Sequence, residues 1–293
     1  MLIKDEFLLP ADDYGREAME KKATEESAEI LKTSIGKSIL GREITSYVIG
    51  EGKRVAVYVG CHHALESLGS NLLYLMLYAL GNKREFTRLA VGVDREIFLK
   101  IYKLVIIPCL NPDGVELRLH GAKNSPLKER QLKMSGGDFS SWQSNARGVD
   151  LNHNYDSGFY EYKKTEAEKG ILPGATLYSG EYPESEPETK ALGGVIRALQ
   201  PSLTVSLHSQ GEEIYHSKVA SRLAKALCAK TGYKTVKAFG TAAYGGLTDY
   251  LDRVGLAALT LEIGKGTNPL PQSDLPLIAE RLLAPLIALP TLV

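Results

Sequence analysis

Short, largely apolar runs alternate along this chain with longer segments of helical periodicity. The runs are rich in β-branched and aliphatic residues, as expected of strands that are buried on both faces, and they lie at 54–60, 102–110, 202–208 and 256–264. Helical patterns lie at 70–80, 185–199, 217–232 and 245–255. This alternation predicts an α/β fold with a mixed, mostly parallel central sheet and helices on both faces.

Several connecting segments carry signals of their own. Residues 44–52 alternate in polarity and end in glycine, which predicts a strand and a turn. The sequence "NPDG" at 111–114 predicts a turn after a strand. Residues 120–147 are polar and lack a clear period, so we expect a long loop that serves a site. "SEPET" predicts a helix start of the capping-box type at Ser185, with Pro187 in the first turn.

The ends of the chain complete the expected organisation. Neither a repeat nor a low-complexity linker interrupts the sequence, so we expect a single domain over 1–293. Charges recur among apolar residues at helical spacing from residue 12 to 33, which predicts an N-terminal helical extension over 1–33. The apolar segment 274–293 is interrupted by Glu280 and Arg281, and we expect a helix packed on the body of the domain.

Composition narrows the choice of partners and compartment. Lysine plus arginine and aspartate plus glutamate both total 35, so the formal net charge is zero. Nucleic acids and anionic membranes attract a basic excess, so we expect neither as a partner. No run reaches the ~20 apolar residues that a spanning helix needs, and the N-terminus lacks the apolar core of a signal peptide. Three cysteines cannot all pair, and free thiols suit a reducing compartment, so we expect a cytoplasmic protein.

Two histidines and a glutamate stand together in "GCHHALES", just after the run at 54–60. Catalytic zinc takes imidazole nitrogens and carboxylate oxygens and keeps one position open. His63 and Glu66 could supply two ligands, and His208, at the end of another run, could supply the third. The spacing also allows His62 to pair with Glu66. Taken singly, Glu66 could face a helix dipole and His208 could be a core histidine; their shared place at strand ends favours a metal.

Glu262 interrupts the otherwise apolar run "LTLEIG". A glutamate in such a run is almost never buried unless it is paired or functional. One interpretation is a salt bridge to a neighbouring lysine or arginine. The other, which we favour, is a general base beside a zinc-bound water, whose pKa zinc can lower to about 7.

At this point the residues resemble those of the zinc carboxypeptidase family, the carboxypeptidase A-like metallopeptidases. The matching segments come in the family's order between about residue 34 and 264: "GKSILGREITSYVIG", "GCHHALES", "NPDG", "NARGVDLNHNYD", "SEPET", "SLHSQGEEIY", "GGLTDYL" and "TLEIG". The resemblance implies a single zinc peptidase catalytic domain with one Zn²⁺ ion per chain. It makes His63, Glu66 and His208 the zinc ligands and Glu262 the general base.

The resemblance also implies roles for three residues of "NARGVDLN". Asp150 corresponds to the carboxylate that orients a ligand histidine. Arg147 looks like the arginine that stabilises the oxyanion formed on the scissile carbonyl, although the preceding loop varies in length across the family. Asn152 matches the asparagine that helps to hold a substrate carboxylate.

The sequence departs from the family pattern in the expected substrate pocket. The family usually has arginine after that asparagine, whereas this chain has His153, and histidine cannot copy the bidentate fork of arginine. His153 is therefore either a substrate contact, which we favour, or a loop histidine. Tyr244 is three places from the tyrosine that closes over substrate, so it either substitutes for it or lines the rim. Thr248 stands at the pocket floor, which argues against simple specificity for basic residues.

These features together predict a zinc-dependent metallopeptidase that acts on small peptides. The chain most resembles the bacterial γ-D-glutamyl-diamino acid peptidases, which cut peptidoglycan stem peptides, and the resemblance implies such substrates. Three alternatives stay open: an ordinary C-terminal carboxypeptidase, a zinc-dependent N-acyl amino acid deacylase on the same scaffold, and an inactive binding domain. The sequence does not indicate an oligomeric state.

Overall fold

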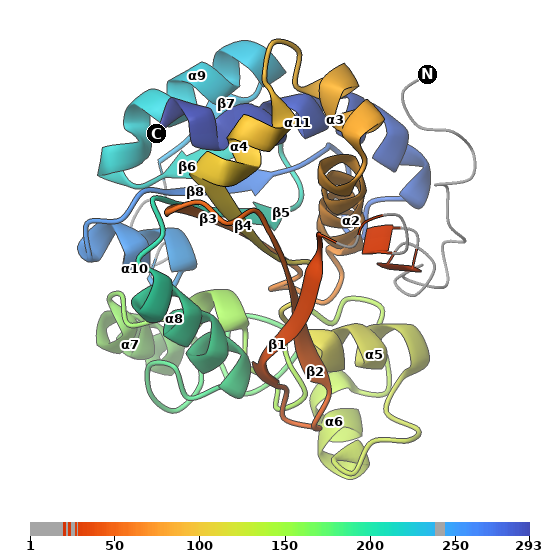
Figure 1. Cartoon of the computed structure of the whole chain (residues 1–293). Helices are drawn as coiled ribbons and strands as arrows, with labels where there is room; N and C mark the ends of the chain where they lie inside the picture. Colours follow the sequence, from red (N-terminus) through yellow and green to blue (C-terminus); the bar gives the residue numbers. More distant parts are fainter. Residues whose placement is uncertain (1–19, 22, 25–26, 28, 238–243) are drawn as a thin grey trace.

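The structure is a computed structural model that describes residues 20–21, 23–24, 27, 29–237 and 244–293. An eight-stranded sheet crosses the middle of the molecule in the order β1-β2-β4-β3-β5-β8-β6-β7 (Figure 1). Its strands are β1 Leu31–Lys37, β2 Glu43–Ile49, β3 Arg54–Gly60, β4 Tyr102–Ile107, β5 Leu203–His208, β6 Glu213–His216, β7 Lys234–Thr235 and β8 Ala258–Glu262.

The four central strands β4, β3, β5 and β8 run parallel to one another. β1, β2 and β6 pair antiparallel with their neighbours towards the two edges, and the short β7 runs parallel to β6. The expected α/β fold with a mixed, mostly parallel sheet is therefore confirmed. Parallel strands need crossover connections, which explains why helices separate the central strands in the sequence.

The period of two along β3 builds a core on each face of the sheet. Val55, Val57 and Val59 enter one apolar cluster, whereas Ala56 and Tyr58 enter the other. Every residue of β3 after Arg54 is buried. This two-sided burial is the physical reason why the run reads as continuously apolar.

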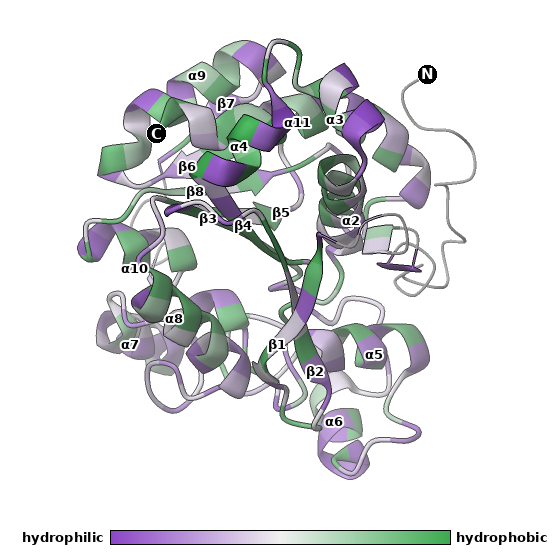
Figure 2. Cartoon of the chain, in the orientation of Figure 1, coloured by the Kyte–Doolittle hydropathy of each residue, from purple (hydrophilic) through white to green (hydrophobic). Residues whose placement is uncertain are grey.

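Helices cover both faces, as expected. α2, α9 and α11 supply apolar side chains to one cluster, and α8 and α10 supply them to the other. Figure 2 shows hydrophobic residues along α2 and the central strands and a largely hydrophilic α6. The helices are α2 Ser67–Gly81, α3 Lys83–Leu89, α4 Arg95–Ile101, α5 Pro112–His120, α6 Lys128–Ser135, α7 Phe159–Lys169, α8 Pro187–Leu199, α9 Ser221–Thr231, α10 Leu247–Arg253 and α11 Leu275–Ala288.

Two segments expected as turn and loop are partly helical. "NPDG" begins α5, because the side chain of Asn111 accepts the backbone N–H of Gly114 at 3.0 Å and caps the helix, with Pro112 in its first turn. The expected long loop 120–147 contains α6, which has only Gln131 buried. A helix with one buried residue lacks the apolar stripe that would reveal it in a sequence.

Two expected boundaries also differ. Pro187 does begin α8, but the Ser185 hydroxyl donates to Glu186 Oε1 at 2.8 Å and does not cap the helix, so the expected capping box is absent. The expected N-terminal helical extension lies mostly outside the described residues. Its last three residues, 31–33, belong to the edge strand β1, which pairs with β2.

The C-terminal apolar segment forms α11, packed against α2 and α9 as expected. The stretch Gln272–Leu292 is long and apolar enough to cross a membrane by length and composition alone, contrary to our expectation. Half of its most apolar window is buried inside the fold, as in a core helix.

Candidate metal centre and adjoining pocket

The candidate ligands lie where neighbouring central strands end. β3, β5 and β8 are adjacent in the sheet, and His208 at the end of β5 is the register partner of Glu262 at the end of β8. His63 and Glu66 lie between the end of β3 and the start of α2. Since the carboxyl ends of parallel strands share one edge, residues far apart in the sequence meet there.

The structure brings His63, Glu66 and His208 together. His63 Nδ1 lies 2.9 Å from Glu66 Oε1, and His208 Nδ1 lies 3.0 Å from Glu66 Oε2. The two Nδ1 atoms are 3.3 Å apart. One ligand atom from each residue falls within 4.8 Å of the others, and no second such group of three occurs among the residues that the structure describes.

Asp150 fixes the orientation of the His63 ring. Its Oδ1 lies 3.2 Å from His63 Nε2, on the side of the ring away from Glu66. Its Oδ2 accepts the backbone N–H of Leu177 at 3.1 Å and the Thr176 hydroxyl at 3.2 Å. Although burial opposes its charge, the adjacent His63 ring and these donors hold the pKa of Asp150 below its ordinary value. An ionised Asp150 accepts a hydrogen bond from Nε2–H of His63, so that the neutral ring would present its Nδ1 lone pair to a cation.

The side chains fit a divalent cation. Glu66 is buried, and burial opposes its charge, but His63 and His208 lower its pKa to about 2. Its Oε2 lies at ion-pair distance from His208 Nδ1 but outside hydrogen-bond geometry, so it is a buried acceptor without a donor. A buried carboxylate oxygen and two facing imidazole nitrogens are costly unless a donor or a cation satisfies them. This donor set suits zinc.

His62 lies outside this group, so Glu66 is grouped with His63 and not with His62. Its Nε2 lies 2.9 Å from the Tyr155 hydroxyl and its Nδ1 lies 3.3 Å from the Ser206 hydroxyl. The ring stacks on His208 at a centroid distance of 5.1 Å. Burial lowers the pKa of His62, so the ring is neutral and packs behind the ligand.

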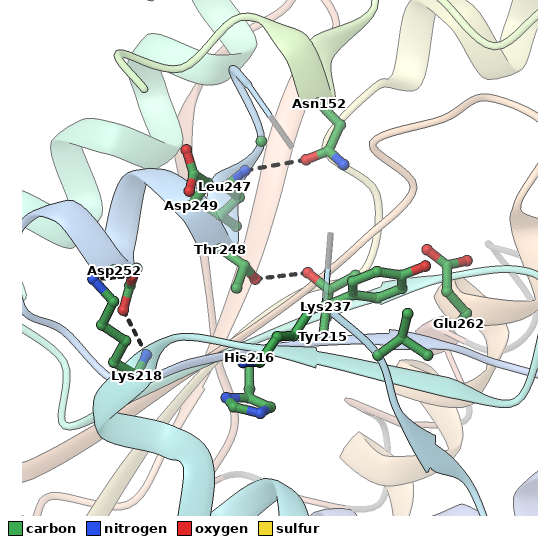
Figure 3. A pocket seen from close by; sticks show the side chains of 13 residues that line it. Asn152, Tyr215, His216, Lys218, Lys237, Leu247, Thr248, Asp249, Asp252 and Glu262 are labelled. Atoms are coloured by element: carbon green, nitrogen blue, oxygen red, sulfur yellow. Dashed lines mark hydrogen bonds and ion pairs between the residues drawn. The ribbon is translucent and has the colours of Figure 1, made fainter. Parts of the chain in front are cut away.

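Glu262 opens onto a cavity of about 610 Å³ beside the metal centre (Figure 3). Burial raises the pKa of Glu262 to about 7. Among the described residues it forms no ion pair with lysine or arginine, contrary to the salt-bridge interpretation. The cavity is lined by Asn152, Tyr215, His216, Lys218, Val236, Lys237, Gly246, Leu247, Thr248, Asp249, Asp252, Thr260 and Glu262.

Two of the expected pocket residues line this cavity and two do not. Asn152 accepts the backbone N–H of Leu247 at 3.2 Å, and Thr248 shares a 2.7 Å hydrogen bond with Thr260. His153 instead stacks flat on Tyr162, with ring centroids 4.3 Å apart, and its Nδ1 bonds the Tyr244 carbonyl at 2.7 Å. His153 therefore does not line this cavity, and its expected contact with substrate stays a prediction.

Tyr244 and Arg147 are also engaged away from the cavity. The Tyr244 ring lies so close to Gly158 that a Cβ there would meet it at 2.5 Å. Arg147 donates from Nε and from Nη2 to the two oxygens of the buried Glu186, each at 3.0 Å. This bidentate pair occupies the guanidinium that was expected to stabilise an oxyanion.

Sequence reasoning missed the wall of the cavity that β6 and the end of β7 form. Tyr215 and His216 lie on β6, and Lys218 and Lys237 follow β6 and β7. Burial and the bond to Glu213 raise the pKa of Tyr215 to about 12. The segment carried one signal, the alternation in "EIYH", but four residues are too few to separate a strand from a loop.

Comparisons with known proteins found similar sequences and structures. The model of the zinc carboxypeptidase family matches residues 16–284. γ-D-Glutamyl-L-diamino acid endopeptidase 1 of Lysinibacillus sphaericus is 28% identical over 273 residues, which cover 87% of this chain and 66% of that protein. Murein peptide amidase A of Escherichia coli K12 is 30% identical over 150 residues, which cover 46% of this chain and 51% of that protein. The chain thus spans less than two thirds of the length of these two relatives.

A solved structure supports the fold. Carboxypeptidase A from Helicoverpa armigera superposes with a TM-score of 0.67 at 18% identity, over 97% of this chain and 74% of that one.

Proposed function

This chain belongs to the zinc carboxypeptidase family and is a metallopeptidase, and on that premise we propose that it hydrolyses small peptidoglycan-derived peptides. The bond that we propose joins γ-D-glutamate to a diamino acid. We also propose that the protein acts in the cytoplasm, because neither Cys61 nor Cys228 forms a disulfide bond among the described residues, and reduced thiols suit a reducing compartment.

The observation that carries the proposal is the meeting of three ligand atoms beside a half-buried carboxylate. His63, Glu66 and His208 converge within 4.8 Å, and Glu262 lies next to His208 across the β5–β8 pair. A zinc ion bound by the three would polarise the scissile carbonyl and acidify a water molecule. Glu262, with a pKa of about 7, is suited both to take a proton from water and to pass it to the leaving amine.

Two findings support the choice of substrate. The Lysinibacillus and Escherichia relatives carry names that describe action on diamino acid and murein peptides. The cavity also offers charges of both signs, from Lys218 and Lys237 and from Asp249 and Asp252. A diamino dicarboxylic acid carries ammonium and carboxylate groups at once, and mixed charges in a pocket complement such a group.

The test has two parts, performed on the purified chain. Metal analysis should find close to one zinc per chain, and a His208→Ala variant should lose it. The zinc-loaded enzyme is then incubated with γ-D-glutamyl-diaminopimelate, with an ordinary peptide that has a free C-terminus, and with an N-acyl amino acid. We expect release of diaminopimelate at the highest kcat/KM.

Other outcomes favour the alternatives. Faster release of a C-terminal residue from the ordinary peptide would indicate a carboxypeptidase, and faster deacylation would indicate an N-acyl amino acid deacylase. A preparation that binds no zinc and cleaves none of the three substrates would leave an inactive binding domain.

A further inference from the structure

The two cations of the family pattern do not serve the cavity in this chain. His153 replaces the usual arginine and is held by Tyr162 and the Tyr244 carbonyl. Arg147 is held by Glu186. A peptide carboxylate that enters the cavity therefore needs a positive charge from another segment.

Lys237 supplies a cation whose charge is not already neutralised. It lines the cavity, and within the described part of the chain no carboxylate lies at ion-pair distance from its ammonium group. The other lining lysine, Lys218, has Asp252 Oδ2 at 3.8 Å. Asp252 also accepts the Lys218 backbone N–H at 2.5 Å, and Asp249 accepts the Ser157 hydroxyl, so both aspartates already have donors.

Asn152 offers a second donor to the same cavity. Its Oδ1 accepts the Leu247 N–H, which fixes the direction of the amide group. Its Nδ2 has no acceptor among the described residues. Figure 3 shows this amide group above the cavity, with Glu262 on one side and the Lys218–Asp252 pair on the other. An amide N–H and an ammonium group that face one space are suited to receive a carboxylate.

We propose that Lys237, together with Asn152, binds the free carboxylate of the amino acid that leaves when the amide bond is cut. This assignment rests on the proposed peptidase function and names the group that its substrate must carry. Lys237 takes over the charge that the family places after Asn152, but it does so from the segment that follows β7.

The exchange of arginine for lysine has a consequence for selectivity. A guanidinium fork demands one orientation of a carboxylate, whereas an ammonium group on a flexible stem acts as a point charge. The pocket therefore requires a carboxylate but tolerates more than one placement of it. This tolerance suits a leaving group that is a branched diamino acid.

The experiment compares two substrates that differ in one group. γ-D-glutamyl-diaminopimelate is paired with its analogue in which the carboxyl next to the scissile amide is a carboxamide. For the wild-type enzyme we expect kcat/KM to be about 10- to 100-fold higher for the free acid, as a charge-assisted hydrogen bond implies. Lys237→Ala should reduce this preference to about threefold or less by raising KM for the acid. Lys237→Arg should restore most of it.

Lys234→Ala is the matched control, because Lys234 is exposed on β7 and does not line the cavity. It should keep the wild-type preference. Equal losses for both substrates in Lys237→Ala, or an unchanged preference, would overturn the assignment. If the wild-type enzyme cleaves neither substrate, the proposed function fails instead. Calorimetric titration with free diaminopimelate then still tests Lys237, since Lys237→Ala should weaken binding about tenfold and an unchanged affinity would refute it.

Discussion

The Glu262 carboxylate has a pKa near neutrality and lies beside the candidate metal ligands, so its removal should affect turnover more than metal binding. Glu262→Gln removes the proton acceptor but changes none of the three ligand atoms. We expect turnover to fall about 10²- to 10⁴-fold, the usual share of general acid–base catalysis. Metal content, measured on the same preparation, should stay at the wild-type level, whereas Glu66→Gln should reduce it. Wild-type turnover in Glu262→Gln would remove this residue as the base.

Glu188 gives the protein a pH dependence of stability that is separate from the metal centre. The residue is fully buried in the first turn of α8, and burial raises its pKa to about 8. Its Oε2 is 3.3 Å from Asn145 Nδ2, its only close side-chain donor among the described residues. The carboxyl is therefore protonated in the native protein at pH 6 and ionised in the unfolded chain.

Between the two pKa values the native state binds the extra proton, so stability falls as pH rises from about 4.5 to about 8. From pH 6 to pH 8 we expect this group to remove about 2 kcal/mol from the free energy of unfolding. Glu188→Gln has no titrating group at this position. Between pH 6 and pH 8 its free energy of unfolding should therefore fall by about 2 kcal/mol less than that of the wild-type protein. Urea unfolding of both proteins at the two pH values measures the difference. Equal losses would show that Glu188 is ionised in the fold.

For single residues, the sequence predicted which residue types could bind a metal better than it predicted which partners the other polar side chains contact. His63, Glu66 and His208 could be selected because metal chemistry restricts residue type and strand ends restrict position. His153 and Arg147 could not be placed, because their partners Tyr162, Tyr244 and Glu186 come from distant segments. A single sequence gives no measure of which partner a polar side chain will find.

Gly245 connects the segment around Tyr155 and Ser157 to the start of α10, which lines the cavity. Its carbonyl accepts the Tyr155 N–H at 3.0 Å, and its N–H donates to the Ser157 carbonyl at 2.6 Å, just before α10 begins. It has φ +77°, and a Cβ there would lie 2.0 Å from the His153 carbonyl oxygen. Only glycine allows these backbones to approach so closely.

The comparison of Gly245→Ala with Gly255→Ala tests this contact. Gly255 has φ +76° but nothing within 4 Å of its added Cβ, so alanine there should cost only about 1–2 kcal/mol of backbone strain. Gly245→Ala should cost about 3 kcal/mol or more, because the His153 backbone has to move as well. It should also raise KM, because Asn152, which lines the cavity, directly precedes the displaced His153. Thermal unfolding and steady-state kinetics give both values, and equal costs for the two variants would contradict the close approach.

Elements were predictable in proportion to their burial. β3, β4, β5 and β8 were recognised because burial on both faces favours apolar residues along most of each strand. α6 was missed because it buries only Gln131. β6 and β7 were missed because four and two residues are too short to show a period, although their register follows from pairing with β8 and with each other.

For the molecule as a whole, metal binding should contribute to stability. The ligand histidines lie 145 residues apart in the sequence, so an ion would link two distant parts of the fold. A free zinc concentration of 100 times Kd should add about 2.7 kcal/mol to the free energy of unfolding. Scanning calorimetry of chelator-treated protein, before and after addition of zinc, should show a rise in Tm of about 5–10 °C. His208→Ala should show little change, and an equal rise in that variant would indicate zinc binding elsewhere.

The pairing of β3 with β5 means that the candidate site can form only after widely separated parts of the chain have been synthesised. Ala56 lies opposite Leu203, so residues 61–202 are synthesised after β3 and before its partner strand β5. Glu262 follows later still, on β8. A nascent chain that ends before His208 can bind a metal ion only through His63 and Glu66, and binding by two ligands is weak. Stable metal binding therefore requires a chain that extends past His208, and translation products that end before Glu262 should lack peptidase activity.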